Sequence, residues 1–358
     1  MTRSLDDVAL FRALPQVGRQ LPWVRLGDWP TPVEAAPALG PVWIKREDLT
    51  AARYGGNKVR TLEAMFGRAR AAGADRIWAT GAFGSNHAVA TVLHAGAAGL
   101  AAGALLFPQP ASEPACANAS ALLSARPELA ALASVIELPF AMARLRRRPG
   151  AFVMPPGGAT AHGALGALSA AFELAEQAAR GELPWPRHVV VAVGSGCTTA
   201  GLLAGFHLAH ALGLAPPPPR VRSVRVTPWP VTSRLRLARL AHAALAVVDE
   251  LRGASSGLSL WALRAGLDVD GRWLGPGYGR TTTAGERTAE RMRAGGAPPV
   301  DAVYTAKSAA SLLDLAAQDP GPIVFWATKS SRPLPRASDD DVARAPAAVR
   351  SWLGRRAT

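Results

Sequence analysis

Residues 188–206 read HVVVAVGSGCTTAGLLAGF, and this stretch indicates the fold class. Its first half is a continuous apolar run rich in valine, which is typical of a buried strand. Glycine, serine and threonine then form a short loop, and an apolar helical pattern begins directly after it. A buried strand that passes through a short loop into a helix is the building block of a parallel sheet covered by helices.

The same alternation of strand and helix patterns continues along most of the chain. We expect further strands at 76–81, 102–108, 153–158, 221–228 and 323–328, and helices at 59–73, 85–100, 159–181 and 197–213. This alternation predicts an α/β fold with mostly parallel sheets. Ligands bind such sheets in the loops that follow the carboxyl ends of the strands, so these loops are the candidate sites.

The bulk composition is that of a globular protein with a large core. The chain has 358 residues, of which 49% are hydrophobic and 18% charged, enough for two domains or one large α/β domain. Cys116 and Cys197 are its only cysteines; they are too few for a disulfide framework and fit a reducing compartment. We expect no secretory leader and no membrane span, and therefore a cytoplasmic protein.

The net charge of +14 raises the question of a nucleic-acid partner. The arginines are scattered through helical patterns, and the densest run is ARLRRRPG at 143–150. Because a basic tail and interleaved aromatic residues are absent from the sequence, we expect no nucleic-acid binding. An anionic small ligand would also suit a positive protein. The histidines show no metal-ligand spacing with cysteines or carboxylates, so we expect no metal site.

Lysine is scarce, and this draws attention to the positions where it remains. The sequence has 36 arginines but only four lysines, which are Lys45, Lys58, Lys307 and Lys329. A lysine kept in such a chain can mark nucleophilic amine chemistry, which a guanidinium cannot perform. Lys58 follows two glycines that permit close approach of a ligand, and it opens a helical pattern whose dipole helps to lower the pKa of an amine. The alternative is an ordinary exposed lysine in a first helical turn.

A second candidate site is the loop TGAFGSNHA at 80–88. A strand ends at Gly81, and Ser85 is a good N-cap residue for the helix that follows. With Asn86 and His87, Ser85 would present backbone N–H groups and polar side chains at a helix N-terminus, which is a ready site for a carboxylate. The alternative is a plain capping serine with solvated neighbours.

A third candidate is the glycine-containing loop within the opening stretch. Its backbone N–H groups and small side chains make an anion nest suited to a phosphate. The loop lacks the Gly–Lys–Ser/Thr of a P-loop, and a threonine stands where the third glycine of the dinucleotide motif belongs. A simple glycine turn is the alternative. The residues of this loop are Gly194, Ser195, Gly196, Cys197, Thr198 and Thr199.

Together, the three loops predict one particular cofactor. An isolated lysine, a phosphate nest and a carboxylate site are what an enzyme needs to hold pyridoxal phosphate and an amino acid. The lysine would form a Schiff base, and the ring would act as an electron sink for a carbanion at the α-carbon of the amino acid.

The chain resembles a known family, that of D-cysteine desulfhydrase and 1-aminocyclopropane-1-carboxylate deaminase. This family belongs to the tryptophan-synthase-β-like (fold type II) pyridoxal phosphate enzymes. The resemblance extends from about residue 21 to residue 328 and rests on seven blocks in the order of the family. The blocks are WIKREDLT (43–50), YGGNKVRTLE (54–63), TGAFGSNHAVATV (80–92), MPPGGATAHGALG (154–166), VAVGSGCTTAGL (191–202), GPGYG (275–279) and DAVYTAKS (301–308).

The resemblance implies two α/β domains, each a mostly parallel sheet flanked by helices. Residues 1–58 and 171–358 would form the large cofactor-binding domain. Residues 59–170 would form a small inserted domain that closes over the substrate. The resemblance also implies a homodimer that acts on a small amino acid.

The resemblance assigns roles to the residues of the first two loops. Lys58 would carry the Schiff base and move the α-proton of the substrate. Asn86 would bind the phenolic oxygen of the cofactor. Ser85, Asn86 and His87 would hold the substrate carboxylate, with Ser85 also close to the reacting carbon.

Further roles fall on the third loop and on the C-terminal third of the chain. Residues 194–199 would bind the cofactor phosphate. Tyr278 and Tyr304 would be the two active-site tyrosines, and Tyr278 would also touch the substrate. Thr305 would meet the pyridine nitrogen, where the deaminases carry a glutamate. Because a threonine hydroxyl sustains a weaker electron sink, Thr305 favours β-elimination over cyclopropane ring opening.

The predicted activity is therefore a pyridoxal-phosphate-dependent lyase, most like D-cysteine desulfhydrase, which yields pyruvate, ammonia and sulfide. The alternatives are ring opening of the deaminase type, a β-replacement reaction in a specialised pathway, and a non-catalytic protein that binds pyridoxal phosphate. The chain departs from the family at Cys197, which replaces a glycine, at Arg280, and at residues 327–330, where the family often has His–Thr–Gly–Gly. These departures do not change the expected cofactor, but they affect which substrate and which reaction we expect.

Overall fold

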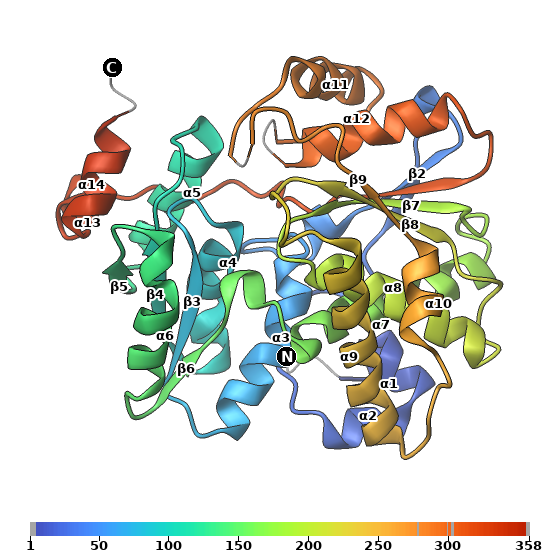
Figure 1. Cartoon of the computed structure of the whole chain (residues 1–358), viewed down its shortest axis with the longest axis horizontal. Coiled ribbons are helices and arrows are strands. Elements are labelled where there is room, and N and C mark those ends of the chain that lie inside the picture. The colour runs from blue at the N-terminus through green and yellow to red at the C-terminus, as the bar shows by residue number, and fades with distance from the viewer. Residues whose placement is uncertain (1–4, 278, 299, 302–303, 356–358) are drawn as a thin grey trace.

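The computed structural model describes residues 5–277, 279–298, 300–301 and 304–355. Two β-sheets form its frame, and helices pack against both (Figure 1). The larger sheet has the strand order β1-β2-β10-β7-β8-β9, and the smaller has the order β5-β4-β3-β6. Among the described strands, β1 and β2 pair antiparallel and all other neighbours pair parallel. The expected α/β class with two mostly parallel sheets is confirmed.

The smaller sheet is built from one continuous part of the chain, and the larger sheet from the parts before and after it. The smaller sheet consists of β3 (Arg76–Ala82), β4 (Ala101–Phe107), β5 (Glu128–Ala131) and β6 (Ala151–Val153). The larger sheet consists of β1 (Val33–Ala35), β2 (Val42–Lys45), β7 (His188–Val193), β8 (Arg220–Arg225), β9 (Leu267–Asp270) and β10 (Ile323–Trp326).

The helices follow the strands in the order that the alternation predicts, with additional helices at both ends of the chain. The first seven α-helices are α1 (Ala9–Ala13), α2 (Pro15–Gln20), α3 (Lys58–Ala71), α4 (Asn86–Ala95), α5 (Glu113–Ser124), α6 (Leu138–Arg146) and α7 (Ala161–Ala179). The others are α8 (Cys197–Ala211), α9 (Arg234–Arg252), α10 (Leu260–Gly266), α11 (Thr283–Ala294), α12 (Thr305–Ala316), α13 (Asp339–Ala343) and α14 (Ala347–Gly354). Short 3₁₀ turns include η3 (Glu47–Leu49), η5 (Val135–Glu137) and η6 (Pro156–Gly158).

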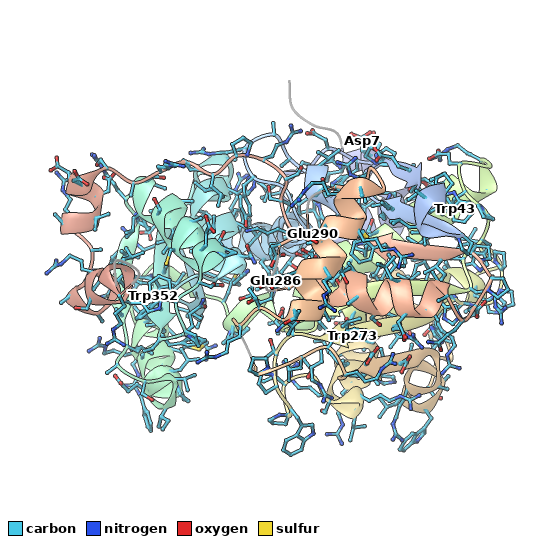
Figure 2. All side chains as sticks on the ribbon, turned by 90° about the horizontal axis from the view of Figure 1, so that it is seen from above. Asp7, Trp43, Trp273, Glu286, Glu290 and Trp352 are labelled. Carbon is cyan, nitrogen blue, oxygen red and sulfur yellow. The ribbon has the colours of Figure 1, made fainter. Side chains whose placement is uncertain are left out.

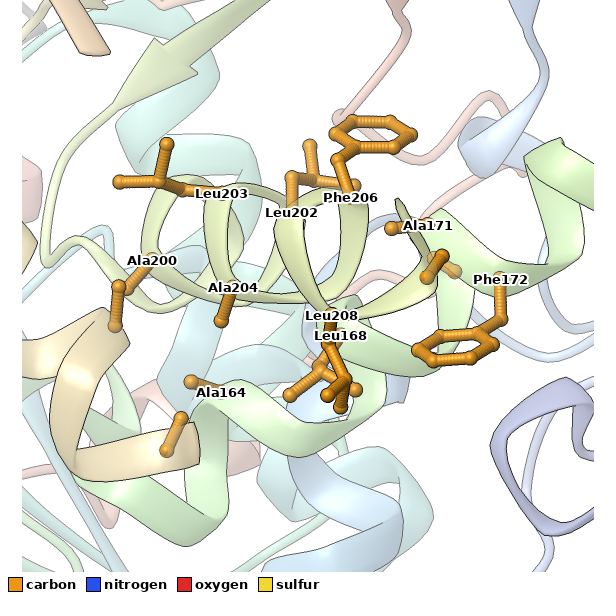
Figure 3. Close-up of a cluster of buried hydrophobic side chains, with 14 of the residues drawn as sticks. Ala164, Leu168, Ala171, Phe172, Ala200, Leu202, Leu203, Ala204, Phe206 and Leu208 are labelled. Carbon is orange, nitrogen blue, oxygen red and sulfur yellow. The ribbon is translucent and has the colours of Figure 1, made fainter. Parts of the chain in front are cut away.

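Helices α7 and α8 pack closely in the largest hydrophobic cluster described, which also contains side chains of β7 (Figure 3). Glycines allow this approach. A Cβ atom added at Gly201 would lie 2.3 Å from the carbonyl oxygen of Ala164, and one at Gly205 would lie 2.4 Å from that of Leu168. Because the neighbouring atoms belong to the backbone of α7, a larger residue at either position would force the two helices apart, so glycine allows this close contact.

The C-terminal helices pack beside the smaller sheet, although the chain has returned to the larger sheet at β10 before it reaches them (Figure 1). Trp352 of α14 shares a hydrophobic cluster with residues of α4 and α5, and its ring centroid lies 5.5 Å from that of Phe83. Figure 2 shows Trp352 at the opposite end of the molecule from Trp43 of the larger sheet. The domain division at residues 59 and 170 stays a prediction, and α7, which spans residue 170, packs with α8.

A buried ionic cluster joins the larger sheet to the helix that Lys58 begins. Arg60 of α3 donates to both carboxylate oxygens of Glu47, each at 2.7 Å, and to Glu173 of α7 at 3.0 Å. Lys45 at the end of β2 donates to Glu173 at 2.6 Å and to Gln177 at 2.5 Å. All these side chains are buried. Because buried charges must be paired, the cluster fixes α3 relative to β2 and α7.

No helix among the described residues is long and apolar enough to cross a membrane. No group of three or more histidine, cysteine, aspartate or glutamate side chains in the described ranges is arranged to hold a metal ion.

Candidate active site

A cavity of about 520 Å³ lies where strand ends of both sheets meet. Residues that follow β7, β8 and β10 line it from the larger sheet, and residues at or just after the ends of β3, β4 and β6 line it from the smaller sheet. This is where parallel sheets bind ligands. All three sequence-predicted loops contribute to its walls through Lys58, Ser85, Asn86, His87, Gly194 and Ser195.

Lys58 is the first residue of α3, and its side chain is half-buried in the wall of the cavity. It makes no hydrogen bond or ion pair with the described residues. Burial lowers the pKa of the Lys58 amine, and the neighbouring Cys197 opposes this only in part. An amine that is poorly solvated and unpaired has a larger neutral, nucleophilic fraction than an ordinary lysine.

The backbone before Lys58 is held by the segment that follows β10. Gly56 has a φ of +94°, and a Cβ atom there would lie 2.7 Å from the carbonyl oxygen of Thr328. Asn57 donates its backbone N–H to that same oxygen at 3.1 Å. Gly55 donates its backbone N–H to the hydroxyl of Ser330 at 3.0 Å. The divergent segment 327–330 therefore holds the loop that presents Lys58.

Helix α4 directs its N-terminus into the cavity. Ser85 is its N-cap, and the Ser85 hydroxyl accepts a hydrogen bond from the backbone N–H of Ala88 at 3.3 Å. The backbone N–H groups of Asn86 and His87 have no hydrogen-bond acceptor among the described residues. Unpaired N–H groups at a helix N-terminus are suited to a carboxylate. This geometry supports the predicted carboxylate site.

The ring of His87 is buried, and neither of its nitrogens has a hydrogen-bond partner in the described structure. Burial, followed by the charge of Lys58, lowers the pKa of His87 to about 3. The ring is therefore neutral at physiological pH and can offer one donor and one acceptor. Because unpaired buried polar atoms are costly, they indicate that a ligand completes this part of the site.

Asn86 is oriented by three donors that converge on its amide oxygen. Tyr54 donates to Oδ1 at 3.0 Å, Asn118 at 2.9 Å and Lys329 at 2.6 Å. Because Oδ1 is the acceptor in all three contacts, the amide nitrogen of Asn86 is the atom left for a ligand. The predicted contact with a phenolic oxygen needs a donor at this position, which this orientation supplies.

The loop between β7 and α8 forms an anion nest. The backbone N–H groups of residues 195–199 have no acceptor among the described residues, and Gly196 has a φ of +104°. Arg236 of α9 lines the cavity nearby and donates to the carbonyl oxygen of Ser195 at 3.0 Å. Free N–H groups at the N-terminus of a helix, with a guanidinium beside them, are suited to a phosphate.

The side chains of Cys197, Thr198 and Thr199 each form a hydrogen bond with a residue outside this loop. The thiol of Cys197 is buried and lies 3.1 Å from the carbonyl oxygen of Gly158, to which it donates. Thr198 accepts a hydrogen bond from Asn57 at 2.7 Å, and Thr199 accepts one from Ser223 at 2.9 Å. A cysteine in place of a glycine therefore fits without crowding the N–H groups. Of this loop, Gly194 and Ser195 are among the residues that line the cavity, whereas residues 196–199 are not.

The predicted residues of the C-terminal third are only partly placed. Tyr304 lines the cavity, whereas Tyr278 lies outside the described residues. Thr305 is buried, and its hydroxyl donates to the carboxylate of Asp301 at 2.5 Å. Asp301, rather than Thr305, is among the residues that line the cavity. The contact between Thr305 and a pyridine nitrogen stays a prediction. Arg280 is exposed and is not part of the cavity wall.

Several residues of the site were missed by the sequence analysis. Tyr54 and Asp301 fall inside the quoted blocks YGGNKVRTLE and DAVYTAKS, so their positions in these blocks were a usable signal. Lys329 was noted only as one of the four lysines and as part of the segment that departs from the family. Arg236 and Asn118 stand in ordinary helical patterns, and nothing local to either residue indicates the site.

Comparisons with known proteins show the family of the chain. Residues 24–328 match the family "Pyridoxal-phosphate dependent enzyme". The chain is 34% identical over 330 residues to Nocardicin C-9' epimerase of Nocardia uniformis subsp. tsuyamanensis, covering 87% of this chain and 94% of the relative. It is 32% identical over 331 residues to D-cysteine desulfhydrase of Salmonella paratyphi C (strain RKS4594), covering 86% and 93%. A crystal structure of an ACC deaminase homologue superimposes with a TM-score of 0.74 at 28% identity, covering 91% of this chain and 95% of that one.

The chain belongs to the family of pyridoxal-phosphate dependent enzymes. Within it, the chain falls with the fold type II enzymes of the D-cysteine desulfhydrase and ACC deaminase family. The resemblance drawn from the seven blocks is thus confirmed, and so are the expected cofactor, pyridoxal 5'-phosphate, and the expectation of an enzyme.

The residues of the cavity fit this cofactor. An unpaired amine at Lys58 can bond to an aldehyde carbon, and the free N–H groups of residues 195–199 can hold a phosphate. The amide nitrogen of Asn86 can donate to a ring oxygen. The unpaired N–H groups of α4 remain for the carboxylate of an amino acid.

Proposed function

We propose that the protein is a lyase that acts on a small amino acid by β-elimination, most like D-cysteine desulfhydrase. D-cysteine and one water would give pyruvate, ammonia and hydrogen sulfide. The observation that carries the proposal is the half-buried, unpaired amine of Lys58 in the same cavity as the free N–H groups of α4. These are a proton acceptor and a carboxylate site within one cavity.

Each group has a defined task in this reaction. Bound pyridoxal phosphate supplies an electron sink for the electrons of the α-carbon. The N–H groups at the start of α4 hold the substrate carboxylate, which orients the α-proton. The Lys58 amine, whose lowered pKa makes its neutral form more accessible, accepts that proton. A substituent on the β-carbon, such as a thiol, then departs with the electron pair of its bond.

The apolar part of the cavity wall favours proton transfer at the α-carbon over side reactions with water. Apolar side chains such as Phe107 and Leu138 line the cavity on the side of the smaller sheet. Movement of the smaller sheet and its helices over the substrate would exclude water from the α-carbon. If Thr305 meets the pyridine nitrogen, as the resemblance implies, a hydroxyl in place of the deaminase glutamate would sustain a weaker electron sink and favour elimination over ring opening.

A titration of the purified holoenzyme with D-cysteine tests the proposal. Visible absorbance is followed while sulfide and pyruvate are assayed in the same cuvette. A shift of the cofactor band together with both products in equal amounts is the expected result. A normal band without product from D-cysteine overturns the desulfhydrase assignment, and ACC and other amino acids with β-leaving groups are tested next.

Epimerisation at the α-carbon is a second candidate, favoured by the 34% identity to Nocardicin C-9' epimerase. It needs the same proton removal and the same carboxylate site, but no leaving group. The apolar side chains of Val135, Leu138 and Phe107 in the cavity wall would accommodate a side chain larger than that of cysteine. Exchange of the α-proton with solvent deuterium, with inversion and without loss of ammonia, would distinguish epimerisation from elimination.

The proposal includes a homodimer in the cytoplasm, as the resemblance implies. The exposed side chains of Ile136 and Phe140, each 78% accessible, support an apolar contact with another chain. Light scattering of the purified protein measures the assembly directly, and a monomeric mass at micromolar concentration would contradict this part of the proposal.

A further inference from the structure

Lys329 is a second lysine in the cavity, and the activity proposed above gives it no task. It follows β10 in the segment that departs from the family. Its ammonium group donates to Asn86 at 2.6 Å and to Asn118 at 2.9 Å. Asn118 in turn donates to Asn86 at 2.9 Å, so the three side chains close a triangle. Lys329 is half-buried and lines the cavity with Asn86.

The contact between Lys329 and Asn86 fixes which end of the amide faces the cavity. If the amide were reversed, its NH₂ group would face an ammonium that can only donate. A charge-assisted hydrogen bond is stronger than a neutral one, and the Lys329 contact is the shortest of the three at Oδ1. Lys329 therefore holds Asn86 as a donor toward the ligand.

No carboxylate among the described residues lies within ion-pair distance of Lys329, although Asp301 in the same cavity attracts its charge from farther away. The two hydrogen-bond partners of Lys329 are neutral amide oxygens, and its ammonium lies 5.8 Å from the centroid of the Tyr54 ring. A ligand atom that meets the Asn86 amide nitrogen would therefore be close to a positive charge that no direct carboxylate contact neutralises. Such a position favours an ionised oxygen.

We propose that Lys329 is a positioning residue, which fixes Asn86 as a donor and places a positive charge beside the ionised ring oxygen of the bound cofactor. The proposal rests on the placement of the cofactor on Lys58 and Asn86, and it is independent of which amino acid is turned over. It assigns a task to the segment 327–330 that glycines could not perform.

The charge of Lys329 has a consequence for the nitrogen that joins Lys58 to the cofactor. A nearby cation disfavours the protonated form of this nitrogen and lowers its pKa. Loss of the Lys329 charge should raise the pH midpoint of the visible cofactor band by about one unit, which is a typical pKa shift for one charge a few ångströms away. The other charged or titratable groups of the cavity are Tyr54, Lys58, His87, Arg236, Asp301 and Tyr304, and the variants below leave them unchanged.

The experiment compares holoenzymes of the wild type and of Lys329→Met, Lys329→Gln and Lys329→Arg. Spectrophotometric pH titration gives the midpoint of the cofactor band, and equilibrium dialysis gives the dissociation constant of pyridoxal phosphate. Both neutral variants should raise the midpoint and bind the cofactor more weakly, whereas Lys329→Arg should stay close to the wild type in its midpoint. Glutamine can still donate to Asn86, so a shift shared by glutamine and methionine reports the charge.

Asn118→Ala serves as the matched control, because it removes a partner of Asn86 without changing the charge of the cavity. It should weaken cofactor binding while leaving the midpoint within a few tenths of a unit. Thermal melting of the apoproteins reports structural damage separately. The proposal is overturned if the neutral variants keep the wild-type midpoint and lose only melting temperature. It is also overturned if the wild type takes up no pyridoxal phosphate, whereas failure to turn over D-cysteine leaves the titration fully informative.

Discussion

Arg60 and Glu173 form a buried ion pair between α3 and α7, with 3.0 Å between Nη2 and Oε1. Arg60 lies two residues after Lys58, so the pair holds the first turn of the helix that carries the predicted catalytic amine. Glu173 also accepts from Lys45 and is therefore shared by two cations. Removal of the Glu173 carboxylate would leave the two buried positive charges of Arg60 and Lys45 with only one carboxylate, Glu47, to balance them.

Glu173→Gln should lower the free energy of unfolding by about 3–5 kcal/mol, because it breaks a buried ion pair and leaves charge uncompensated. Urea denaturation of the apoprotein at neutral pH measures the change. Glu176→Gln on the same helix is the control, since Glu176 pairs with Arg12 at the surface. That variant should lose less than about 1 kcal/mol. Equal effects of the two substitutions would contradict the role given to the buried cluster.

The stabilisation from Glu173 should depend on pH with a definite sign. The charges of Arg60 and Lys45 outweigh the effect of burial and lower the pKa of Glu173 to about 2. A carboxyl group whose folded pKa is depressed stabilises the protein above its unfolded pKa of about 4.3, and this contribution is lost as the pH falls toward 2. The stability difference between the wild type and Glu173→Gln should therefore shrink between about pH 4.5 and pH 2. Denaturation curves of both proteins across this range provide the check.

The central strands could be predicted from the sequence because they are continuous apolar runs. Strands β3, β4, β7, β8 and β10 all overlap the expected ranges, and β3, β4 and β8 each extend one residue beyond them. The edge strands β1, β5 and β9 are three or four residues long and only partly buried, so they carry little apolar pattern. The C-terminal helices were also missed, because their attachment beside the smaller sheet depends on tertiary contacts such as that between Trp352 and Phe83.

The site was predictable where a loop has a local chemical pattern. Glycines before Lys58, a capping serine before Asn86 and the small residues of 194–199 each indicate backbone that can approach a ligand. The network around Asn86 has no such local signal. Asn118 and Lys329 are 211 residues apart in sequence and meet only because β10 ends beside the smaller sheet.

Gly201→Ala should destabilise the protein by about 1–3 kcal/mol, although alanine is the better helix former. The added methyl group would lie 2.3 Å from the carbonyl oxygen of Ala164, which forces α7 and α8 apart. Gly354→Ala is the control, because a Cβ atom at Gly354 would meet no neighbour within 4 Å. Thermal melting of both apoproteins compares them. A melting temperature for Gly201→Ala at or above that of the wild type would show that the interface can yield.

Lys58→Ala should abolish the visible band of covalently bound cofactor and reduce turnover by at least about 10²-fold, since it removes the bonding amine and the proton acceptor together. Absorbance of the reconstituted protein and a pyruvate assay with D-cysteine measure the two effects. Lys307→Arg is the control: Lys307 donates to the carbonyl oxygens of Leu274 and Gly277 at 2.9 and 3.2 Å, a contact that a guanidinium can also make. It should keep the band. If Lys58→Ala keeps the band, the bonding amine is another one, and Lys329 in the same cavity becomes the residue to replace next.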